Sequence, residues 1–380
     1  MVWIHGGGFI NGAGSDYDAS VLTAKARAVV VTINYRLGVF GFLALPGLSA
    51  EAPDHASGNF GLQDQQAALA WVQRNIAAFG GNPRNVTAFG ESAGGGSVCA
   101  HLASPTARGL FRRAIIESGP RTSPIVNPLP TVTAAEATGV AIAQRLGCAD
   151  PTTQVACMRG QEVSALLDAG GAGLGVFGPD VGGALLPQQI TTALSSGRFN
   201  RVPTMNGTNH DEYRLFVALQ FDLAGNPVSA AQYPALLQAR FGANAARVLA
   251  EYPLSRYASP SEALSAVITD ASFACPALGS DRLLARHVPT FAYEFNDPDA
   301  PEFLFTDPVM PLGAFHASDE MIRYWSRFAA TGQPNGPATP HWPGYRDRGL
   351  IQSLAPGRTG PVSTFSADHH CALWSSLSAS

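Results

Sequence analysis

The sequence predicts an α/β fold, in which a mostly parallel central sheet is flanked by helices. Residues 27–35 form a β-branched run, RAVVVTINY, typical of a strand buried on both faces. Residues 61–79 carry apolar side chains at roughly helical spacing, and the Gly80-Gly81-Asn82-Pro83 sequence ends that helix. Apolar runs at 86–89 and 114–116 then lie on either side of a small-residue helix. Alternating strands and helices in this order are typical of a parallel sheet.

Further strands are predicted at both ends of the chain. Val2-Trp3-Ile4 reads as a hydrophobic strand, and residues 202–207 and 290–295 read as later strands of the same sheet. The apolar segment 38–43 is interrupted by glycine, so we expect a loop or turn that packs on the core.

The chain of 380 residues is predicted to form one domain, residues 1–380. Proline-punctuated, alanine-rich sequence at about 120–200 and helical patterns within 229–285 predict helical insertions over the sheet. Chain termini normally lie in exposed sequence, whereas this chain begins almost directly with a core strand. We therefore expect the N-terminal part of the fold to be missing.

The composition excludes several classes of protein. Hydrophobic residues make up 46% and charged residues 14%, which is inconsistent with disorder. The net charge is −4 and no basic cluster extends beyond Arg112-Arg113, so nucleic acid is not an expected partner. No uninterrupted apolar stretch suggests a membrane span, and no Cys/His spacing suggests a metal site. We expect no cofactor, and the oligomeric state stays open.

The most informative motif is the pentapeptide Gly90-Glu91-Ser92-Ala93-Gly94, which follows a predicted strand and precedes a predicted helix. A G-x-S-x-G sequence in this setting is typical of a nucleophile elbow, which exposes the serine hydroxyl on a strained turn. Two glycines and a serine also occur together by chance in a chain with 40 glycines. The motif alone therefore leaves the interpretation open.

A second glycine-rich segment, His5-Gly6-Gly7-Gly8-Phe9, follows the first predicted strand. Backbone N–H groups of such a segment, together with the amide after the nucleophile, can form an oxyanion hole. We name Gly7, Gly8 and Ala93 as the donors. Glycine-rich turns are usually only turns, but the two motifs together favour acyl transfer.

An elbow serine also needs a base and an orienting acid, which in hydrolases of this kind follow in the order Ser, acid, His. The loop after strand 202–207 carries Asp211 and Glu212, and spacing does not decide between them. Among the histidines beyond that loop, His316 lies on a glycine-preceded loop after a strong strand. A loop histidine is more often a surface or hydrogen-bonded residue, and His210 beside Asp211 is an alternative pair.

The chain resembles the type-B carboxylesterase and lipase family of α/β-hydrolases, which includes the cholinesterases, over nearly its whole length. The matching stretches are WIHGGGF at 3–9, NYRLGVFGFL at 34–43, NFGLQDQQAALAWVQRNIAAFGGNP at 59–83, VTAFGESAGG at 86–95, GTNHDEYRLF at 207–216, GAFH at 313–316 and RFAATGQPN at 327–335.

The resemblance implies Ser92 as nucleophile, His316 as base and Glu212, rather than Asp211, as acid. It also implies an oxyanion hole at Gly7, Gly8 and Ala93. In similar proteins a serine at the position of Ser118 hydrogen-bonds the acid, although a simple strand-end cap explains this serine equally well. Glu91 would add a second carboxylate near the site.

The resemblance also implies two disulfide bonds, Cys148–Cys157 and Cys275–Cys371, with Cys99 left as a buried thiol. Such pairing indicates a secreted or extracytoplasmic protein, whereas the alternative is five unpaired cytosolic thiols.

Three features depart from the family pattern. The segment that normally precedes the WIHGGG strand is absent, and Asp319 to Trp325 follow His316 after an unusually short passage. The glycine after the acid is replaced by Tyr213. From these departures we expect the scaffold around the catalytic residues to be incomplete.

The resemblance thus implies a serine carboxylesterase that hydrolyses small-molecule esters through an acyl-enzyme, with no cofactor. An inactive truncated fragment or a non-catalytic binding protein on the same fold is the alternative. A hormone-sensitive-lipase-like enzyme is disfavoured, because Asn34-Tyr35-Arg36-Leu37 continues into Gly-Val-Phe-Gly. Substrate preference is not encoded in these motifs.

Overall fold

The computed structural model describes residues 1–119, 128–171, 173, 175–301, 310–317, 322–337 and 339–377. The chain divides into two compact units. The first comprises Met1–Gly119, Pro128–Pro203 and Trp325–Gln333, and the second comprises Pro120–Asn127, Thr204–Tyr324 and Pro334–Ser380. Residues 120–127 of the predicted insertion and residues 318–321 beyond His316 lie outside the described residues.

The described residues of the first unit contain a parallel sheet in the order β2-β1-β3-β4. Ile4 pairs with Gly90, and Glu91 pairs with Glu117, so the carboxyl ends of β1, β3 and β4 are aligned. Strands β1, β3 and β4 lie where the sequence predicts them. Strand β2 comprises only Val31 and Thr32 of the predicted strand at 27–35, and these residues are half-buried and exposed, respectively. The prediction of a strand buried on both faces was wrong, because β2 lies at the edge of the sheet. The strand bounds are β1 Val2–Ile4, β2 Val31–Thr32, β3 Thr87–Glu91 and β4 Arg113–Glu117.

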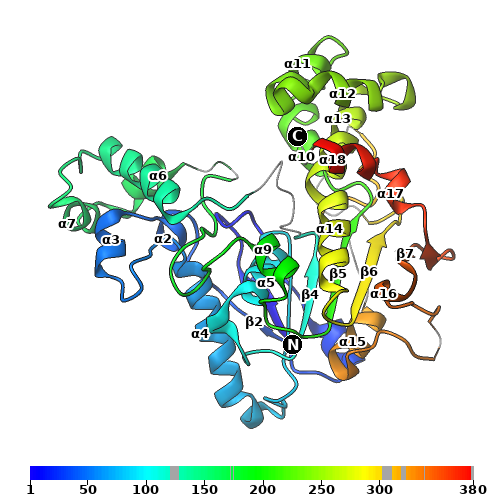
Figure 1. The fold of residues 1–380 in the computed structure, drawn as a ribbon, viewed down its shortest axis with the longest axis horizontal. Helices are drawn as coiled ribbons and strands as arrows, with labels where there is room; N and C mark the ends of the chain where they lie inside the picture. Colours follow the sequence, from blue (N-terminus) through cyan, green and yellow to red (C-terminus); the bar gives the residue numbers. More distant parts are fainter. Residues whose placement is uncertain are drawn as a thin grey trace. The chain divides into compact units, whose positions relative to one another are not determined.

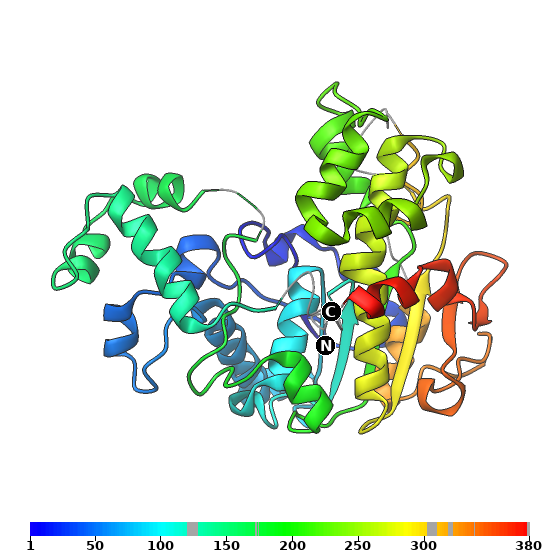
Figure 2. The same ribbon diagram turned by 45° about the horizontal axis from the view of Figure 1, so that its top comes forward.

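Helices accompany this sheet along the first unit. Helix α5 packs against β1, β3 and β4 (Figure 2). The predicted helix at 61–79 is present as α4 followed by a 3₁₀ turn at Ile76–Phe79. The α-helices are α1 Ser20–Ala26, α2 Gly38–Phe42, α3 Pro46–Glu51, α4 Phe60–Asn75, α5 Ala93–Ala103, α6 Val132–Arg145, α7 Gln154–Arg159, α8 Val163–Gly170, α9 Ile190–Ser196 and most of α15 Ile322–Thr331.

The segment predicted as a loop or turn at 38–43 is instead the short helix α2, so the predicted loop was wrong, whereas its predicted packing on the core is confirmed. Glycine disfavours helix formation, which is why the sequence indicated a turn. Burial overrides that preference: α2 packs against α4 and α8, and the ring of Phe42 contacts Phe9 with centroids 5.1 Å apart. Gly41 lies against the carbonyl oxygen of Arg36, a position that has no room for a Cβ atom.

The described residues of the second unit contain a sheet in the order β5-β6-β7-β8. Strands β5, β6 and β7 are parallel, and β8 pairs antiparallel with β7. Strands β5 and β6 confirm the predictions at 202–207 and 290–295. The sequence analysis missed β7 and β8, which are short, and Pro361 weakens the strand pattern of β8. Their bounds are β5 Thr204–Asn209, β6 Thr290–Phe295, β7 Ile351–Leu354 and β8 Gly360–Val362.

Helix α14 runs along β5 and β6, and α10 to α13 gather with α18 around a separate apolar core (Figure 1). Tyr233, Tyr252, Val267 and Trp374 are members of that core. The α-helices of this unit are α10 Arg214–Val217, α11 Gln232–Phe241, α12 Ala245–Glu251, α13 Pro260–Thr269, α14 Cys275–Leu284, α16 Tyr345–Arg348, α17 Phe365–Asp368 and α18 Cys371–Leu377.

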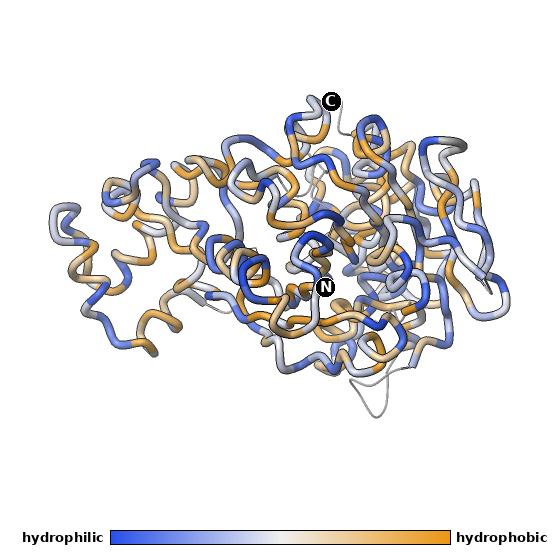
Figure 3. Tube along the Cα trace, turned by 90° about the horizontal axis from the view of Figure 1, so that it is seen from below, coloured by the Kyte–Doolittle hydropathy of each residue, from blue (hydrophilic) through white to orange (hydrophobic). Residues whose placement is uncertain are grey.

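Helices α13 and α14 are joined by a π-helical segment, Asp270–Ala274, into the continuous run Pro260–Leu284. Among the described residues, this is the one helix long and apolar enough to cross a membrane by length and composition alone. Within its apolar window, 78% is buried inside the protein, as expected for a core helix. Hydrophilic residues are interspersed with hydrophobic ones along the chain (Figure 3). The sequence did not single this run out, because charged residues interrupt it at positions 262, 270, 281 and 282.

Candidate active site

Ser92 lies at the junction of β3 and α5, as the elbow motif predicts. Its backbone has φ 55° and ψ −119°, a combination that side chains rarely adopt. The Ser92 N–H donates to the carbonyl oxygen of Glu117, at 2.9 Å, which ties the turn to the end of β4. The strain is therefore held by the sheet.

The glycines of the motif fit the crowding around this turn. A Cβ atom on Gly94 would overlap the carbonyl oxygen of Ile4 in β1, and one on Gly90 would lie 2.5 Å from the same oxygen. A Cβ atom on Gly6 would lie 3.1 Å from Ser92 Cβ. Strand β1 therefore approaches the elbow so closely that only glycine fits.

The predicted oxyanion-hole donors belong to the same unit as Ser92. Gly7 and Gly8 adopt φ values of 91° and 63° after β1, and Ala93 is the first residue of α5. In the described part of the chain, the N–H groups of Gly7 and Gly8 donate to no carbonyl or side chain. The first N–H groups of a helix likewise have no partner within the helix, and they favour negative charge.

The second unit holds the predicted base and acid as a hydrogen-bonded pair. His316 Nδ1 lies 2.5 Å from Glu212 Oε2, and both side chains are buried. The other oxygen of Glu212 accepts from Thr208 Oγ1 at 2.6 Å and from the Asn209 N–H at 2.8 Å. Asn209 Nδ2 in turn donates to the Phe315 carbonyl, at 2.7 Å, beside His316. The carboxylate is thus fixed from β5 and directed at the imidazole.

Asp211 has a different set of partners from its neighbour Glu212. Its carboxylate accepts from the Ala314 N–H at 3.1 Å and pairs with Arg214 at 2.9 Å. A Cβ atom on Gly313 would overlap the same carboxylate. Asp211 therefore connects the loop of His316 to the loop of Asp211 and Glu212, whereas Glu212 faces His316.

Aromatic rings enclose His316 within the second unit. The ring centroids of Phe216 and Phe273 lie 5.0 and 5.2 Å from that of His316. Phe216 follows the acid loop on α10, and Phe273 belongs to the π-helical segment between α13 and α14. Both rings are half-buried and pack beside the imidazole, which is itself buried.

The remaining predicted residues of the first unit lie around the elbow. Glu91 is buried at the end of β3, with one carboxylate oxygen packed beside Gly6. Glu117 ends β4 and accepts a 2.7 Å hydrogen bond from Trp325 Nε1. Ser118 has φ 48°, and its hydroxyl is buried with no hydrogen-bond partner among the described residues. The proposed link from Ser118 to the acid stays a prediction.

Comparison with known proteins decides the family. A sequence model of the carboxylesterase family matches residues 1–374.

The chain belongs to the carboxylesterase family. It is 35% identical to a cocaine esterase of Oryctolagus cuniculus, over 90% of this chain and 69% of that protein. It is 33% identical to carboxylesterase 1D of Rattus norvegicus, over 100% of this chain and 74% of the relative. An acylcarnitine hydrolase of Mus musculus is 33% identical over 90% of this chain, which spans 65% of its length.

Membership of the carboxylesterase family establishes two points. The fold is that of the α/β-hydrolases, as the sequence resemblance implied. The activity class is carboxylic ester hydrolysis.

Both disulfide bonds implied by the family resemblance are present. Cys148 and Cys157 are joined across nine positions, and Cys275 and Cys371 across 96. Cys99 is a free, buried thiol in α5.

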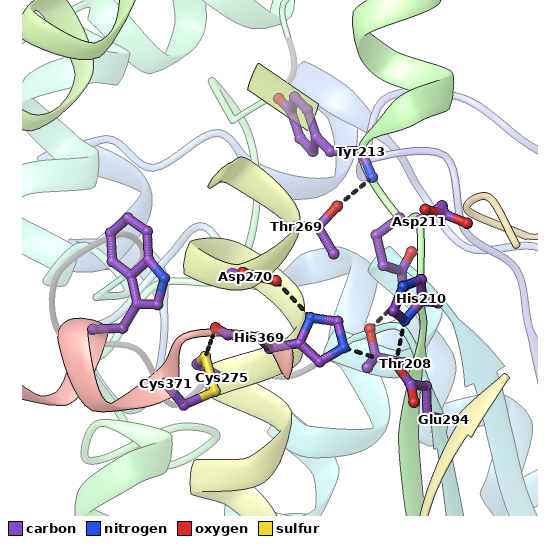
Figure 4. Close-up of polar contacts among 12 residues, drawn as sticks. Thr208, His210, Asp211, Tyr213, Thr269, Asp270, Cys275, Glu294, His369 and Cys371 are labelled. Atoms are coloured by element: carbon purple, nitrogen blue, oxygen red, sulfur yellow. Dashed lines mark hydrogen bonds and ion pairs between the residues drawn. A yellow bond between two sulfur atoms is a disulfide. The ribbon is translucent and has the colours of Figure 1, made fainter. Parts of the chain in front are cut away.

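Sequence analysis missed a buried cluster in the second unit of this carboxylesterase. His210, Glu294 and His369 offer ligand atoms within 4.8 Å of one another, as a metal site would require (Figure 4). The geometry favours hydrogen bonds instead. A ring nitrogen of each histidine lies within 2.8 Å of the same Glu294 oxygen, Oε1. This distance is shorter than the spacing between two ligand atoms of one metal ion. The other nitrogen of His369 is already paired with Asp270.

Proposed function

We propose that this carboxylesterase hydrolyses small carboxylic esters through an acyl-enzyme intermediate, with Ser92 as nucleophile, His316 as general base and Glu212 as the orienting acid. Gly7, Gly8 and Ala93 supply the oxyanion hole. The observation that carries the proposal is the backbone of Ser92, a non-glycine residue at φ 55° where β3 turns into α5. Strain of this kind costs about 1–3 kcal/mol and is typical of a functional position.

In the first half of the reaction, Ser92 Oγ attacks the ester carbonyl carbon while His316 Nε2 accepts the hydroxyl proton. Glu212, bonded to Nδ1, fixes the tautomer that leaves Nε2 able to accept that proton, and its charge stabilises the imidazolium. The N–H groups of Gly7, Gly8 and Ala93 stabilise the oxyanion, each by about 3 kcal/mol.

In the second half, His316 returns the proton to the departing alkoxide, and the alcohol leaves the acyl-enzyme. Water then attacks the acyl carbonyl carbon, with His316 as general base, and the carboxylic acid departs as Ser92 regains its proton. The proposal requires Ser92 Oγ and His316 Nε2 to come within hydrogen-bond distance during the reaction.

The two disulfide bonds support a proposed location in an oxidising compartment, such as the secretory pathway or the cell exterior. Cys148–Cys157 closes a loop within the first unit and Cys275–Cys371 closes one within the second, and Cys148 and Cys371 are buried.

The test is Ser92→Ala, assayed with a short p-nitrophenyl ester and with a fluorophosphonate label. Hydrolysis should fall to the residual level left by binding and the oxyanion hole, on the order of a thousandfold over water. The label should disappear with the hydroxyl. Ser97→Ala is the matched control, because Ser97 lies on α5, the helix that Ser92 precedes, and its hydroxyl donates to the Ala93 carbonyl.

Retained turnover in Ser92→Ala, or a label that maps to another residue, would refute the nucleophile. A wild-type protein that folds but neither turns over esters nor reacts with the label would favour a non-catalytic binding protein instead.

A further inference from the structure

Four ionisable side chains form a continuous chain of hydrogen bonds inside the second unit (Figure 4). Asp270 lies 2.5 Å from His369 Nδ1, His369 Nε2 lies 2.7 Å from Glu294, and Glu294 lies 2.8 Å from His210 Nδ1. Asp270, Glu294 and His369 are buried, whereas the His210 side chain is 39% exposed. The chain therefore begins in the core and ends at the acid loop.

The geometry favours charge on the central histidine. Each ring nitrogen of His369 faces a carboxylate oxygen, and both nitrogens donate only when the ring is an imidazolium. Burial lowers the pKa of His369, but the charges of Asp270 and Glu294 and their hydrogen bonds raise it to about 10. Burial raises the pKa of Glu294, but the bonds from His210 and His369 lower it to about 2.

His210 connects this network to the proposed acid. It lies two residues before Glu212, and its backbone N–H donates to the Phe295 carbonyl at the end of β6. Its side chain then bonds Glu294, the residue before Phe295. The acid loop is therefore attached to β6 through both the backbone and the side chain of His210.

The opposite end of the acid loop is attached to the same helical run. The Tyr213 N–H donates to Thr269 Oγ1 at 2.9 Å, and Thr269 immediately precedes Asp270 (Figure 4). Of the two residues that flank Asp211-Glu212, His210 is thus connected to Asp270 through Glu294 and His369, and Tyr213 is bonded directly to Thr269. The following π-helical turn presents Phe273 to His316. Single π-helical turns within α-helices are frequent at functional sites.

We propose that His210 is a positioning residue, which holds the acid loop so that Glu212 meets His316 in the reactive geometry. The inference rests on the proposed triad. Glu294, His369 and Asp270 form the charged anchor on which His210 is fixed. Because a displacement of about 1 Å costs up to about a hundredfold in rate, a loose anchor reduces turnover without contact with the substrate.

His210→Ala tests the proposal, because it detaches the loop at the exposed end and leaves the Asp270–His369–Glu294 anchor in place. We expect kcat to fall by about 10- to 100-fold. KM should stay nearly constant, since the His210 side chain does not contact the reacting atoms of the proposed triad. His210→Lys keeps a charged donor toward Glu294 and should hold kcat within about threefold of wild type.

His370→Ala is the matched control. His370 Nδ1 lies 2.7 Å from Glu251, so its loss also removes a half-exposed histidine–carboxylate pair in the same unit. Neither His370 nor Glu251 is hydrogen-bonded to the acid loop among the described residues. The His370 ring contacts Tyr252, whose hydroxyl donates to Asp270, but the alanine variant leaves that hydrogen bond in place, so kcat should stay close to wild type. All rates are expressed per fluorophosphonate-reactive site, and thermal melts record stability separately.

Wild-type kcat in His210→Ala would overturn the proposal. An equal loss in His370→Ala, or a failure of His210→Lys to restore turnover, would overturn it as well. A lower Tm with unchanged kcat per labelled site would mean that the network is only structural. The proposed triad is judged by Ser92→Ala, so its failure is distinguishable from the failure of this inference.

Discussion

Replacing Glu212 by Gln separates the role of this carboxylate from that of its neighbour more sharply than any other substitution. One oxygen of Glu212 accepts from Thr208 and from the Asn209 N–H, and the other faces His316 Nδ1. The backbone N–H of Asn209 is a fixed donor, so a glutamine at position 212 must direct its side-chain carbonyl oxygen at this N–H. Its NH₂ group then faces His316.

That orientation determines the size of the effect. An NH₂ donor at 2.5 Å forces His316 Nδ1 to accept, which places the ring proton on Nε2. A base protonated at Nε2 cannot take the proton of Ser92. Loss of the correct tautomer lowers kcat by about 10⁴, equivalent to about 5.5 kcal/mol of transition-state stabilisation. The fold should survive, because the carbonyl oxygen still satisfies Thr208 and Asn209.

Asp211→Asn is the matched control for Glu212→Gln. The asparagine oxygen still accepts from the Ala314 N–H, and only the pair with Arg214 is lost. A partly exposed ion pair contributes about 0–1 kcal/mol, so activity should stay within about tenfold of wild type. Steady-state kinetics on a p-nitrophenyl ester, with sites counted by fluorophosphonate, measure both variants. Equal losses, or a greater loss in Asp211→Asn, would refute the assignment of Glu212.

Two further predictions concern stability. In the chain-entropy model, removing Cys275–Cys371 should lower the free energy of unfolding by about 4.7 kcal/mol and removing Cys148–Cys157 by about 2.6 kcal/mol, because the sequence separations are 96 and 9 residues. Denaturant unfolding of variants with both cysteines of one disulfide replaced by Ser measures these losses. A larger loss for the short-loop disulfide would contradict the prediction. The network around His369 should be most stabilising between about pH 4.5 and 6.5. His369, with its pKa raised to about 10, loses its contribution as pH rises from 6.5 through 10, and Glu294, with its pKa lowered to about 2, loses its contribution as pH falls from 4.5 through 2. The Tm of wild type should therefore fall from pH 6.5 to 10 more steeply than that of His369→Gln, and parallel curves would argue against a charged His369.

The sequence predicted the first unit well, because its signals are local. The elbow, the strand before it and the helix after it are contiguous, and the glycines that the turn needs are visible as residues. The segment at 38–43 was misread, since its glycines indicate a turn and only burial against α4 and α8 makes it helical. No local pattern reports such packing.

The acid and the base illustrate the limit of spacing arguments. Asp211 and Glu212 are adjacent carboxylates, and spacing alone does not distinguish them. Their partners do, because Ala314 and Arg214 engage one carboxylate, whereas Thr208, Asn209 and His316 engage the other. A sequence signal was available in the strand TMNGTN, where polar residues occupy a core strand. Buried polar residues need partners, so such a strand indicates a hydrogen-bonded site at its end.

The second unit provides two kinds of ionic contact around one loop, and the cost of burying charge explains the difference between them. Asp211 lies near the surface and closes the loop with a partly exposed arginine. The buried carboxylates of Asp270 and Glu294 need full compensation, which the two histidines supply through three hydrogen bonds and Tyr252 through a fourth, from its hydroxyl to Asp270. A buried network of this kind has few alternative arrangements, since each displaced partner leaves an unpaired charge. The network is therefore suited to hold a loop whose carboxylate must lie at hydrogen-bond distance from an imidazole. Neutral side chains in place of the network would retain the packing without fixing the loop.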